Sequence, residues 1–496
     1  MEKLIQQQHL LFITLLLLIS ACSEQVETIV VKNEPDAAVT DTAQTDDSEM
    51  EDATFKHLKY GEVLPIKSLD PLFAQNAASQ RAVQHVYDGL VKLNKNGKIL
   101  PAIAKDWKVT SDSLSYRFTL RKDIFYHDSK IFINGLGRRI SAKDILFLFE
   151  RMADRNVPPE AAERFMSIEG FEAYVNEQRH IYLPEERKVK EIQGISLPND
   201  STVIFNLNRA DSHFLTKLAS PHASVYPQEA ISEQGSSLHD NPVGSGPFQL
   251  SSIRGDSLYI FNNNKEYPLF DVNLDRLDII YEEDELALIR NMGNEEINAI
   301  AELGPKMLQA FLTNNLEIKS SYPNAYQAYE GGTITYHLTT AAEKDVDSKQ
   351  QQLAELLKNY PLSDFSNYIN PGAVRVSASN AFNQSQPQAG NNNQNSSLRA
   401  TFPNDVFIRM YYQRLAGELS NKGISFTMLN TLVPNSQVDI HTHRVDALEQ
   451  QTGQNELLAI AFQHMAITDG TITGFGLNKY PWWFDVATVD IQPVAR

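Results

Sequence analysis

The sequence predicts a mixed α/β fold, because segments with the period of a strand and segments with the period of a helix both occur along the chain. Residues 114–121 (LSYRFTLR) alternate apolar and polar side chains, the pattern of a strand with one buried face. Residues 202–207 (TVIFNL) follow a similar pattern and are rich in β-branched side chains. A mixed pattern of this kind indicates a fold class and leaves function open.

One helix is predicted to begin after Ser141, because Asp144 follows three residues later as in a capping box. Apolar side chains then recur at i, i+3, i+4 and i+7, at Ile145, Leu148, Phe149 and Met152. Residues 350–357 and 408–419 are two further helix candidates. Residues 383–397, almost all Asn, Gln, Ser and Gly, predict a surface loop inside a domain, since periodic apolar segments resume on both sides.

An apolar run at residues 10–19 is followed by two small residues and then by Cys22, the pattern of a bacterial lipoprotein signal. The run is too short to span a bilayer as a helix. We therefore interpret residues 1–21 as a signal peptide and Cys22 as the lipidated residue that anchors the chain to a membrane. An ordinary signal peptide, or a core segment that contains a cysteine, is the alternative. Residues 22–55, rich in acidic and small polar side chains, predict a disordered linker behind the anchor.

Composition excludes several classes of function. The formal net charge of −18 disfavours nucleic acid as a partner, because phosphate binding requires clustered Lys and Arg. With one cysteine the chain has no disulfide, no thiolate metal site and no cysteine nucleophile in its globular part. It also has no Gly-x-Ser-x-Gly and no His-Glu-x-x-His motif, so an enzyme is not expected. The length after the linker is enough for two or more domains.

Several segments, in a fixed order, resemble the family 5 extracellular solute-binding proteins, the oligopeptide-, dipeptide- and nickel-binding components of ABC importers. The centre of the resemblance is residues 100–129 (LPAIAKDWKVTSDSLSYRFTLRKDIFYHDS) and 140–152 (ISAKDILFLFERM). The other similar segments are residues 68–91 (SLDPLFAQNAASQRAVQHVYDGLV), 199–231 (NDSTVIFNLNRADSHFLTKLASPHASVYPQEAI), 241–250 (NPVGSGPFQL) and 468–491 (TDGTITGFGLNKYPWWFDVATVDI).

The resemblance implies a periplasmic binding protein type II fold, with two lobes of mixed sheets flanked by helices and a hinge between the lobes. It implies a first lobe at residues 56–280, a shortened and divergent second lobe at 281–455, and a return to the first lobe at 456–496. In the family the ligand is enclosed between the lobes, a membrane permease recognises the closed form, and no bond is made or broken.

The resemblance also suggests ligand contacts. The loop after Leu69-Asp70-Pro71 lines the cleft in relatives, which makes Gln75 and Asn76 candidate contacts. Gln75 is uncharged, so a cationic ligand terminus gains less there than from the acidic residue that some relatives carry. Three aromatic side chains of the segment 468–491, here called the tail, either form a wall of the cleft or pack into the first lobe: Tyr480, Trp482 and Trp483.

The predicted second lobe contains one departure from the family and one pair of histidines. Relatives carry an ADYPDP segment in the second lobe, whose acidic group helps to clamp the ligand, and this chain has no such segment. His441 and His443 lie two residues apart on a predicted strand, so both point to one face, and Asp439 is close in sequence. We interpret them as a surface pair and expect neither a metal site nor a cofactor.

The function expected is that of a membrane-anchored lipoprotein that captures a peptide or similar small solute for an ABC importer. Its expected partners are that ligand and the ABC permease and ATPase subunits, and the protein is expected to be a monomer on the periplasmic side of the envelope. The alternative is a sensor or envelope interaction module with a degenerate ligand site. The missing acidic segment favours the alternative, and Ser23 after the lipidated cysteine leaves residence at the outer membrane open.

Overall fold

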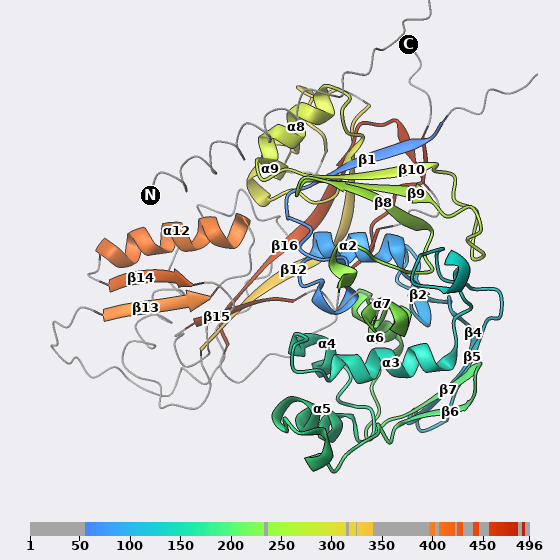
Figure 1. The fold of residues 1–496 in the computed structure, drawn as a ribbon. Coiled ribbons are helices and arrows are strands. Elements are labelled where there is room, and N and C mark those ends of the chain that lie inside the picture. The colour runs from blue at the N-terminus through green and yellow to red at the C-terminus, as the bar shows by residue number, and fades with distance from the viewer. Residues whose placement is uncertain are drawn as a thin grey trace, which may run out of the picture. The chain divides into compact units, whose positions relative to one another are not determined.

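A computed structural model of the chain describes residues 55–232, 237–313, 317–323, 325–340, 396–401, 406–421, 424–429, 440–445, 456–484 and 489–491 (Figure 1). Cys22, the helix candidate at 350–357 and most of the predicted loop at 383–397 lie outside the described residues. In the described part of the chain, no helix combines the length and the apolar character needed to cross a bilayer.

The strands confirm the mixed α/β prediction. The larger sheet has ten strands in the order β14-β13-β15-β12-β16-β11-β1-β10-β9-β8. In chain order these strands are β1 (His57–Glu62), β8 (Phe248–Arg254), β9 (Leu258–Asn263), β10 (Arg276–Tyr281), β11 (Ala299–Ile300), β12 (Gln327–Thr340), β13 (Ser396–Thr401), β14 (Ile424–Leu429), β15 (Ile440–Val445) and β16 (Glu456–Thr468). Strand β1 pairs in parallel with β10 and β11, whereas β8, β9 and β10 are antiparallel neighbours.

A second sheet of four antiparallel strands has the order β4-β5-β7-β6. It contains β4 (Ala104–Val109), β5 (Ser115–Leu120), β6 (Ile195–Asn199) and β7 (Thr202–Asn206). The two strands predicted from alternation are β5 and β7, and Tyr116, Phe118 and Leu120 of β5 are its buried side chains. Two small ribbons complete the strands: β2 (Val91–Leu93) with β3 (Ile99–Pro101), and β17 (Ile472–Thr473) with β18 (Asp490–Ile491).

The described α-helices lie beside these sheets (Figure 1). They are α2 (Ala77–Val86), α3 (Ala142–Met152), α4 (Pro159–Glu163), α5 (Phe171–His180), α6 (Phe214–Leu218), α7 (Gln228–Ser232), α8 (Glu285–Gly293), α9 (Pro305–Phe311) and α12 (Val406–Asn421). Short 3-10 turns are η1 (Pro71–Phe73), η2 (Ile133–Gly135), η3 (Pro184–Glu186), η4 (Pro221–Ala223) and η5 (Ser237–His239).

The predicted helices α3 and α12 are confirmed, and α3 also begins where the sequence predicted. Ser141 is the N-cap of α3, and its backbone N–H donates to Asp144 Oδ2 over 2.8 Å, as a capping box requires. The apolar side chains of α3 at Ile145, Leu148 and Phe149 are at most 1% exposed, because this stripe of the helix faces the core. The candidate at 408–419 lies inside α12.

Two long antiparallel strands, β12 and β16, connect two regions of the larger sheet. At one end Thr468 of β16 pairs with Ala299 of β11, which in turn lies beside β1. At the other end Thr335–Thr340 of β12 pair with β15, next to β13 and β14. The register between β12 and β16 shifts between Glu330 and Thr333. The pair therefore crosses from the region that contains β1 to the region that contains β13 (Figure 1).

Candidate functional site

The loop between β1 and α2 carries the predicted contacts, and a buried ion pair holds it. Asp70 is 0% exposed, and Nη1 of Arg151 in α3 donates to its Oδ1 over 2.9 Å. The second guanidinium nitrogen pairs with Asp70 Oδ2. Oδ1 also accepts from the N–H of Leu72, which caps the short turn η1. Because charge-assisted bonds of this kind are strong, the path of the loop is set from inside the protein.

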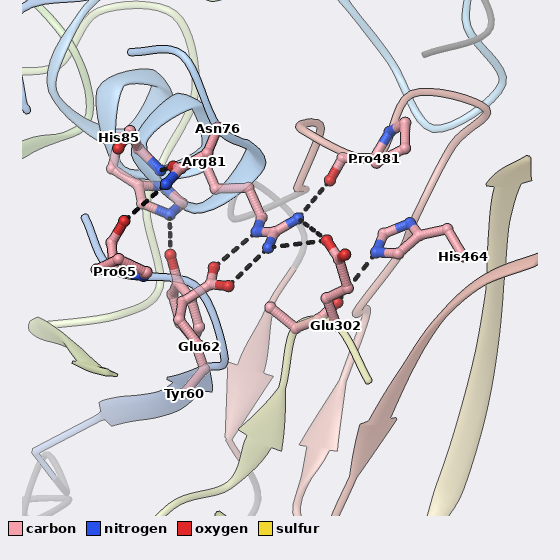
Figure 2. Close-up of polar contacts among 11 residues, drawn as sticks. Tyr60, Glu62, Pro65, Asn76, Arg81, His85, Glu302, His464 and Pro481 are labelled. Carbon is pink, nitrogen blue, oxygen red and sulfur yellow. Dashed lines mark hydrogen bonds and ion pairs between the residues drawn. The ribbon is translucent and has the colours of Figure 1, made fainter. Parts of the chain in front are cut away.

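The two predicted loop contacts have different surroundings. Gln75 is exposed, directly before α2. Asn76 is the half-buried N-cap of α2, and its Oδ1 accepts from the N–H of Ser79 over 2.8 Å. Its Nδ2 donates to the carbonyl oxygen of Pro65 over 2.8 Å (Figure 2). Both ends of the Asn76 amide therefore contact the protein's own backbone, whereas Gln75 presents its side chain to solvent.

The aromatic residues of the tail pack inside the protein. Tyr480, Trp482 and Trp483 are 2%, 3% and 6% exposed. The rings of Tyr480 and Trp482 are stacked with centroids 5.3 Å apart, and Trp483 Nε1 donates to the carbonyl oxygen of Leu93 in β2 over 3.1 Å. A polar partner for a buried indole N–H is typical of tryptophan in a core. The tail is thus part of the same hydrophobic core as β1 and α2.

Arg81 connects α2, the helix that follows this loop, to the tail. Its side chain is fully buried in α2, and Nε and Nη2 donate to the two carboxylate oxygens of Glu62, each over 2.6 Å. Nη1 donates to Glu302 Oε2 over 3.3 Å and to the carbonyl oxygen of Pro481 over 2.5 Å. Figure 2 shows the guanidinium between the carboxylates of Glu62 and Glu302. One side chain therefore joins the end of β1, α2, the segment after β11 and the tail.

The electrostatics of this cluster favour a permanently charged Arg81. Burial alone lowers the pKa of the guanidinium, but the attraction of Glu62 and then of Glu302 outweighs it and raises that pKa above the ordinary value. Glu62 and Glu302 are 0% and 4% exposed, so water does not screen the interaction strongly. A bidentate guanidinium–carboxylate pair in such a site fixes geometry as well as charge.

Two buried histidines border the cluster. The Tyr60 hydroxyl and His85 Nε2 are 3.1 Å apart, and burial together with the charge of Arg81 lowers the pKa of His85 to about 3. His85 is therefore neutral at pH 7. His464 of β16 lies 3.1 Å, through Nε2, from the carbonyl oxygen of Ala301 (Figure 2). These contacts extend the polar network from β1 to the crossing strand β16.

The tail also lies against the irregular point of the crossing strands. The register shift in β12 falls at Gly331 and Gly332. A Cβ on Gly332 would lie 1.9 Å from the carbonyl oxygen of Lys479, and a Cβ on Gly331 would lie 2.6 Å from Nδ1 of His464. Glycine is therefore required here by close approach of the tail backbone and of β16. The paired glycines inside a strand are a sequence signal for such a site.

Sequence reasoning missed Arg81, Glu62 and Glu302. No local pattern indicates them, because Glu302 is 221 residues from Arg81.

His127, which follows Tyr126 near the loop at 129–137, is a structural residue: its Nε2 lies 2.9 Å from the carbonyl oxygen of Gly246, and burial lowers its pKa to about 4. Among the described residues, no group of three or more His, Cys, Asp or Glu side chains could hold a metal ion.

His441 and His443 lie on β15, where they stand opposite Thr339 and His337 of β12. Asp439 lies outside the described residues.

Comparison with known proteins identifies relatives of the chain. The family model for bacterial extracellular solute-binding proteins, family 5 (middle), matches residues 98–361. Di/tripeptide-binding protein 1 of Pseudomonas aeruginosa is 31% identical over 192 residues, which are 38% of this chain and 33% of that protein. Heme-binding protein A of Haemophilus influenzae is 27% identical over 244 residues, which are 48% of this chain and 42% of that protein. The matched segment thus spans a third to less than half of the length of these relatives.

Solved structures resemble the fold over a longer range. Haemophilus influenzae OppA in complex with the peptide RPPGFSPFR superposes with a TM-score of 0.70 at 13% identity, covering 89% of this chain and 99% of that chain. A Pseudoalteromonas dipeptide-binding protein in complex with Met-Leu has a TM-score of 0.66 at 15% identity, covering 88% and 100%. These similarities confirm the two-lobed type II binding-protein fold.

The family model covers more than half of the chain, and the resemblance seen in the sequence is thereby confirmed. Its members are binding proteins rather than enzymes. The chain belongs to the bacterial extracellular solute-binding proteins of family 5.

Proposed function

We propose that this protein captures a peptide or similar small solute for an ABC importer by closing two lobes around it, without chemical change of the ligand. The crossing pair β12 and β16 is the observation that carries the proposal. Two long strands that run from one region of the sheet to another, and lose register at two glycines, suit a hinge. Closure is stabilised only when a ligand contacts both sides.

We propose the lobe division expected from the sequence, with residues 56–280 and 456–496 in the first lobe and 281–455 in the second. The pairing of β1 with β10 and the antiparallel run β8–β10 support a first lobe built on these strands. Strands β13, β14 and β15 support a second lobe. Strand β11 lies within the proposed bounds of the second lobe yet pairs with β1, so in the sheet itself the chain crosses between the two regions at β12 and returns through β16.

Ligand contacts are proposed at the start of α2 and in the tail. Gln75 is exposed and follows a loop that the buried Asp70–Arg151 pair holds in place, and its N–H donates to the carbonyl oxygen of Phe73, so its backbone position is fixed. Asn76 fixes the start of the helix beside it. Trp482 and Trp483 are almost fully buried, so we propose that they, with Tyr480, form the packed wall behind the ligand and meet it through their remaining exposed edges.

We further propose that Cys22 carries the lipid anchor and that residues 22–55 are the linker between membrane and binding domain. In this arrangement a monomer on the periplasmic side delivers solute to a permease and its ATPase subunits. The relatives' names support a peptide as the first ligand to test, because several are di- or tripeptide-binding proteins.

Thermal unfolding in the presence of di- and tripeptide pools tests the proposal. A ligand at a hundredfold excess over its Kd adds about 2.7 kcal/mol to the free energy of unfolding and raises Tm. In a Trp107→Phe background, the two tail tryptophans are the remaining indoles, so the same peptides should change the fluorescence emission. Thermal stabilisation with unchanged emission would contradict only the proposed ligand contacts of the tail and would leave solute capture supported. No stabilisation by any peptide or cell-derived solute would contradict solute capture and favour the non-transporting alternative.

A further inference from the structure

The segment between β5 and α3 presents two apolar side chains to solvent. Ile133 is 88% exposed and Leu136 is 64% exposed, both within the short loop formed by residues 129–137. Phe125, close to the base of the same segment, is 52% exposed. A single exposed apolar residue is ordinary on a protein surface, but two within four residues of a rigid loop indicate a surface that meets a partner.

The base of this exposed loop is fixed by Arg138. Its Nη2 donates to Asp144 Oδ1 and its Nε donates to Glu229 Oε1, each over 2.6 Å. The guanidinium carbon also lies 5.2 Å from the ring centroid of Tyr126, and that ring stacks on Phe132 at 5.9 Å. The loop therefore stands on a packed and ion-paired support.

The backbone of the exposed loop is equally constrained. The N–H of Ser129 donates to the carbonyl oxygen of Gly135 over 2.9 Å, and the N–H of Gly135 donates to that of Phe132 over 3.0 Å. Asn134 and Gly135 have positive φ of 60° and 76°. A Cβ on Gly137 would lie 1.8 Å from the carbonyl oxygen of Tyr126. The exposure of Ile133 and Leu136 is thus a property of a closely specified conformation.

Several exposed cations surround the exposed loop, beside the exposed carboxylates of Asp123 and Asp128, although the whole chain has a formal net charge of −18. Lys130 within the loop, Arg139 at its base and Lys122 and Lys143 on its flanks are exposed. Backbone bonds join the flanks, because the N–H of Ile140 donates to the carbonyl oxygen of Ile124 over 3.2 Å. The nearby Asp128 accepts a bond from the N–H of Gly137. Apolar side chains thus stand among exposed cations.

We propose that the exposed loop docks onto a lipid bilayer that carries anionic headgroups. Ile133 and Leu136 enter the boundary between headgroups and acyl chains, and the surrounding Lys and Arg contact lipid phosphates. Charge complementarity selects this partner, since a bilayer offers both an apolar layer and a continuous anionic surface. The docking is separate from solute capture and requires no closure of the lobes.

A fluorescent label tests the proposal in the full chain. An environment-sensitive dye is attached at Leu136→Cys, with mass spectrometry to verify that Cys22 is not labelled. The control is the dye at Tyr182→Cys, where the native side chain is 79% exposed outside the loop. Vesicles of phosphatidylcholine alone, and of phosphatidylcholine with phosphatidylglycerol, are then titrated into each protein.

We expect the emission at position 136 to move to shorter wavelength with the anionic vesicles and the emission at position 182 to stay constant. Ile133→Ser should lower the apparent partition coefficient by about tenfold, because it removes one of the inserted apolar groups. Lys130→Glu combined with Arg139→Glu, which alters only exposed side chains, should weaken binding strongly in 0.1 M salt and little in 1 M salt.

Three results would overturn the proposal. The first is no spectral change at position 136 with either vesicle, and the second is an equal change at positions 136 and 182. The third is a spectral change that appears without vesicles and depends on protein concentration, or one that requires an added integral membrane protein. Either result would assign the exposed loop to a protein partner. Peptide binding in the same samples is unaffected in each case, so failure here is distinct from failure of solute capture.

Discussion

Replacing Arg81 with methionine removes the cation that Glu62 and Glu302 both contact, while keeping a long apolar side chain in α2. Both carboxylates stay buried, and the carbonyl oxygen of Pro481 loses its guanidinium donor. Removing one partner of a buried ion pair costs about 3–5 kcal/mol, because the remaining charge is left without its counter-ion. Total stability is typically about 5–15 kcal/mol, so we expect Arg81→Met to fold and to unfold at much lower urea concentration.

The stability that Arg81→Met loses relative to wild type should depend on pH. Without Arg81 the pKa values of the buried carboxyls in the folded protein rise above the unfolded value of about 4.3. The folded state then binds a proton before the unfolded state does, so the stability of the variant relative to wild type increases as pH falls from 7 to 5. Urea unfolding followed by circular dichroism at both pH values measures the difference.

Two further variants make this prediction specific. Arg290→Met removes an ion pair with Asp284 whose side chains are 64% and 55% exposed, and it should cost at most about 1 kcal/mol at either pH. Adding Glu62→Gln and Glu302→Gln to Arg81→Met should restore much of the stability, because the uncompensated charges disappear. If Arg81→Met loses less than about 1 kcal/mol, equally at pH 7 and pH 5, then the ion pairs of Arg81 with Glu62 and Glu302 do not stabilise the fold appreciably.

Three other predictions concern the glycine bulge, a buried acid and the start of α2. Gly332→Ala should lower the urea midpoint of unfolding, since the new Cβ meets the carbonyl oxygen of Lys479 at 1.9 Å. The control Gly417→Ala, with no atom within 4 Å of the new Cβ, should be neutral or stabilising by about 0.5–1 kcal/mol. Equal effects of the two substitutions would refute the close approach. Burial raises the pKa of Asp88 to about 6, so its contribution to stability is full below the unfolded pKa of about 3.9 and is lost as pH rises through 6. Asp88→Asn should therefore gain up to about 3 kcal/mol relative to wild type between pH 4 and pH 7, and a pH-independent difference in urea midpoints would contradict this. Asn76→Ala should cost about 1 kcal/mol through the lost cap while Asn76→Asp keeps most of it, and identical melting curves for the two variants would argue against the cap.

Local patterns explain why much of the fold was predictable. The alternation in β5 and β7 and the capping box of α3 depend on residues within a few positions of one another, and each appears in the structure with the expected burial or bond. Family membership was equally accessible, because the motifs around residues 100–152 are contiguous in sequence. The predicted loop position of Gln75 before α2 also follows from local order.

The amino-acid sequence by itself determined the fold class, the family and several individual strands and helices, because these depend on short-range periodicity and contiguous motifs. Only the tertiary structure decided that Arg81 meets Glu62, Glu302 and Pro481, which are 19, 221 and 400 residues away. It also decided that Trp482 and Trp483 are buried while Ile133 is exposed. Side-chain type alone cannot distinguish a core aromatic from one that lines a cleft, since packing of distant segments determines which surfaces remain in contact with water.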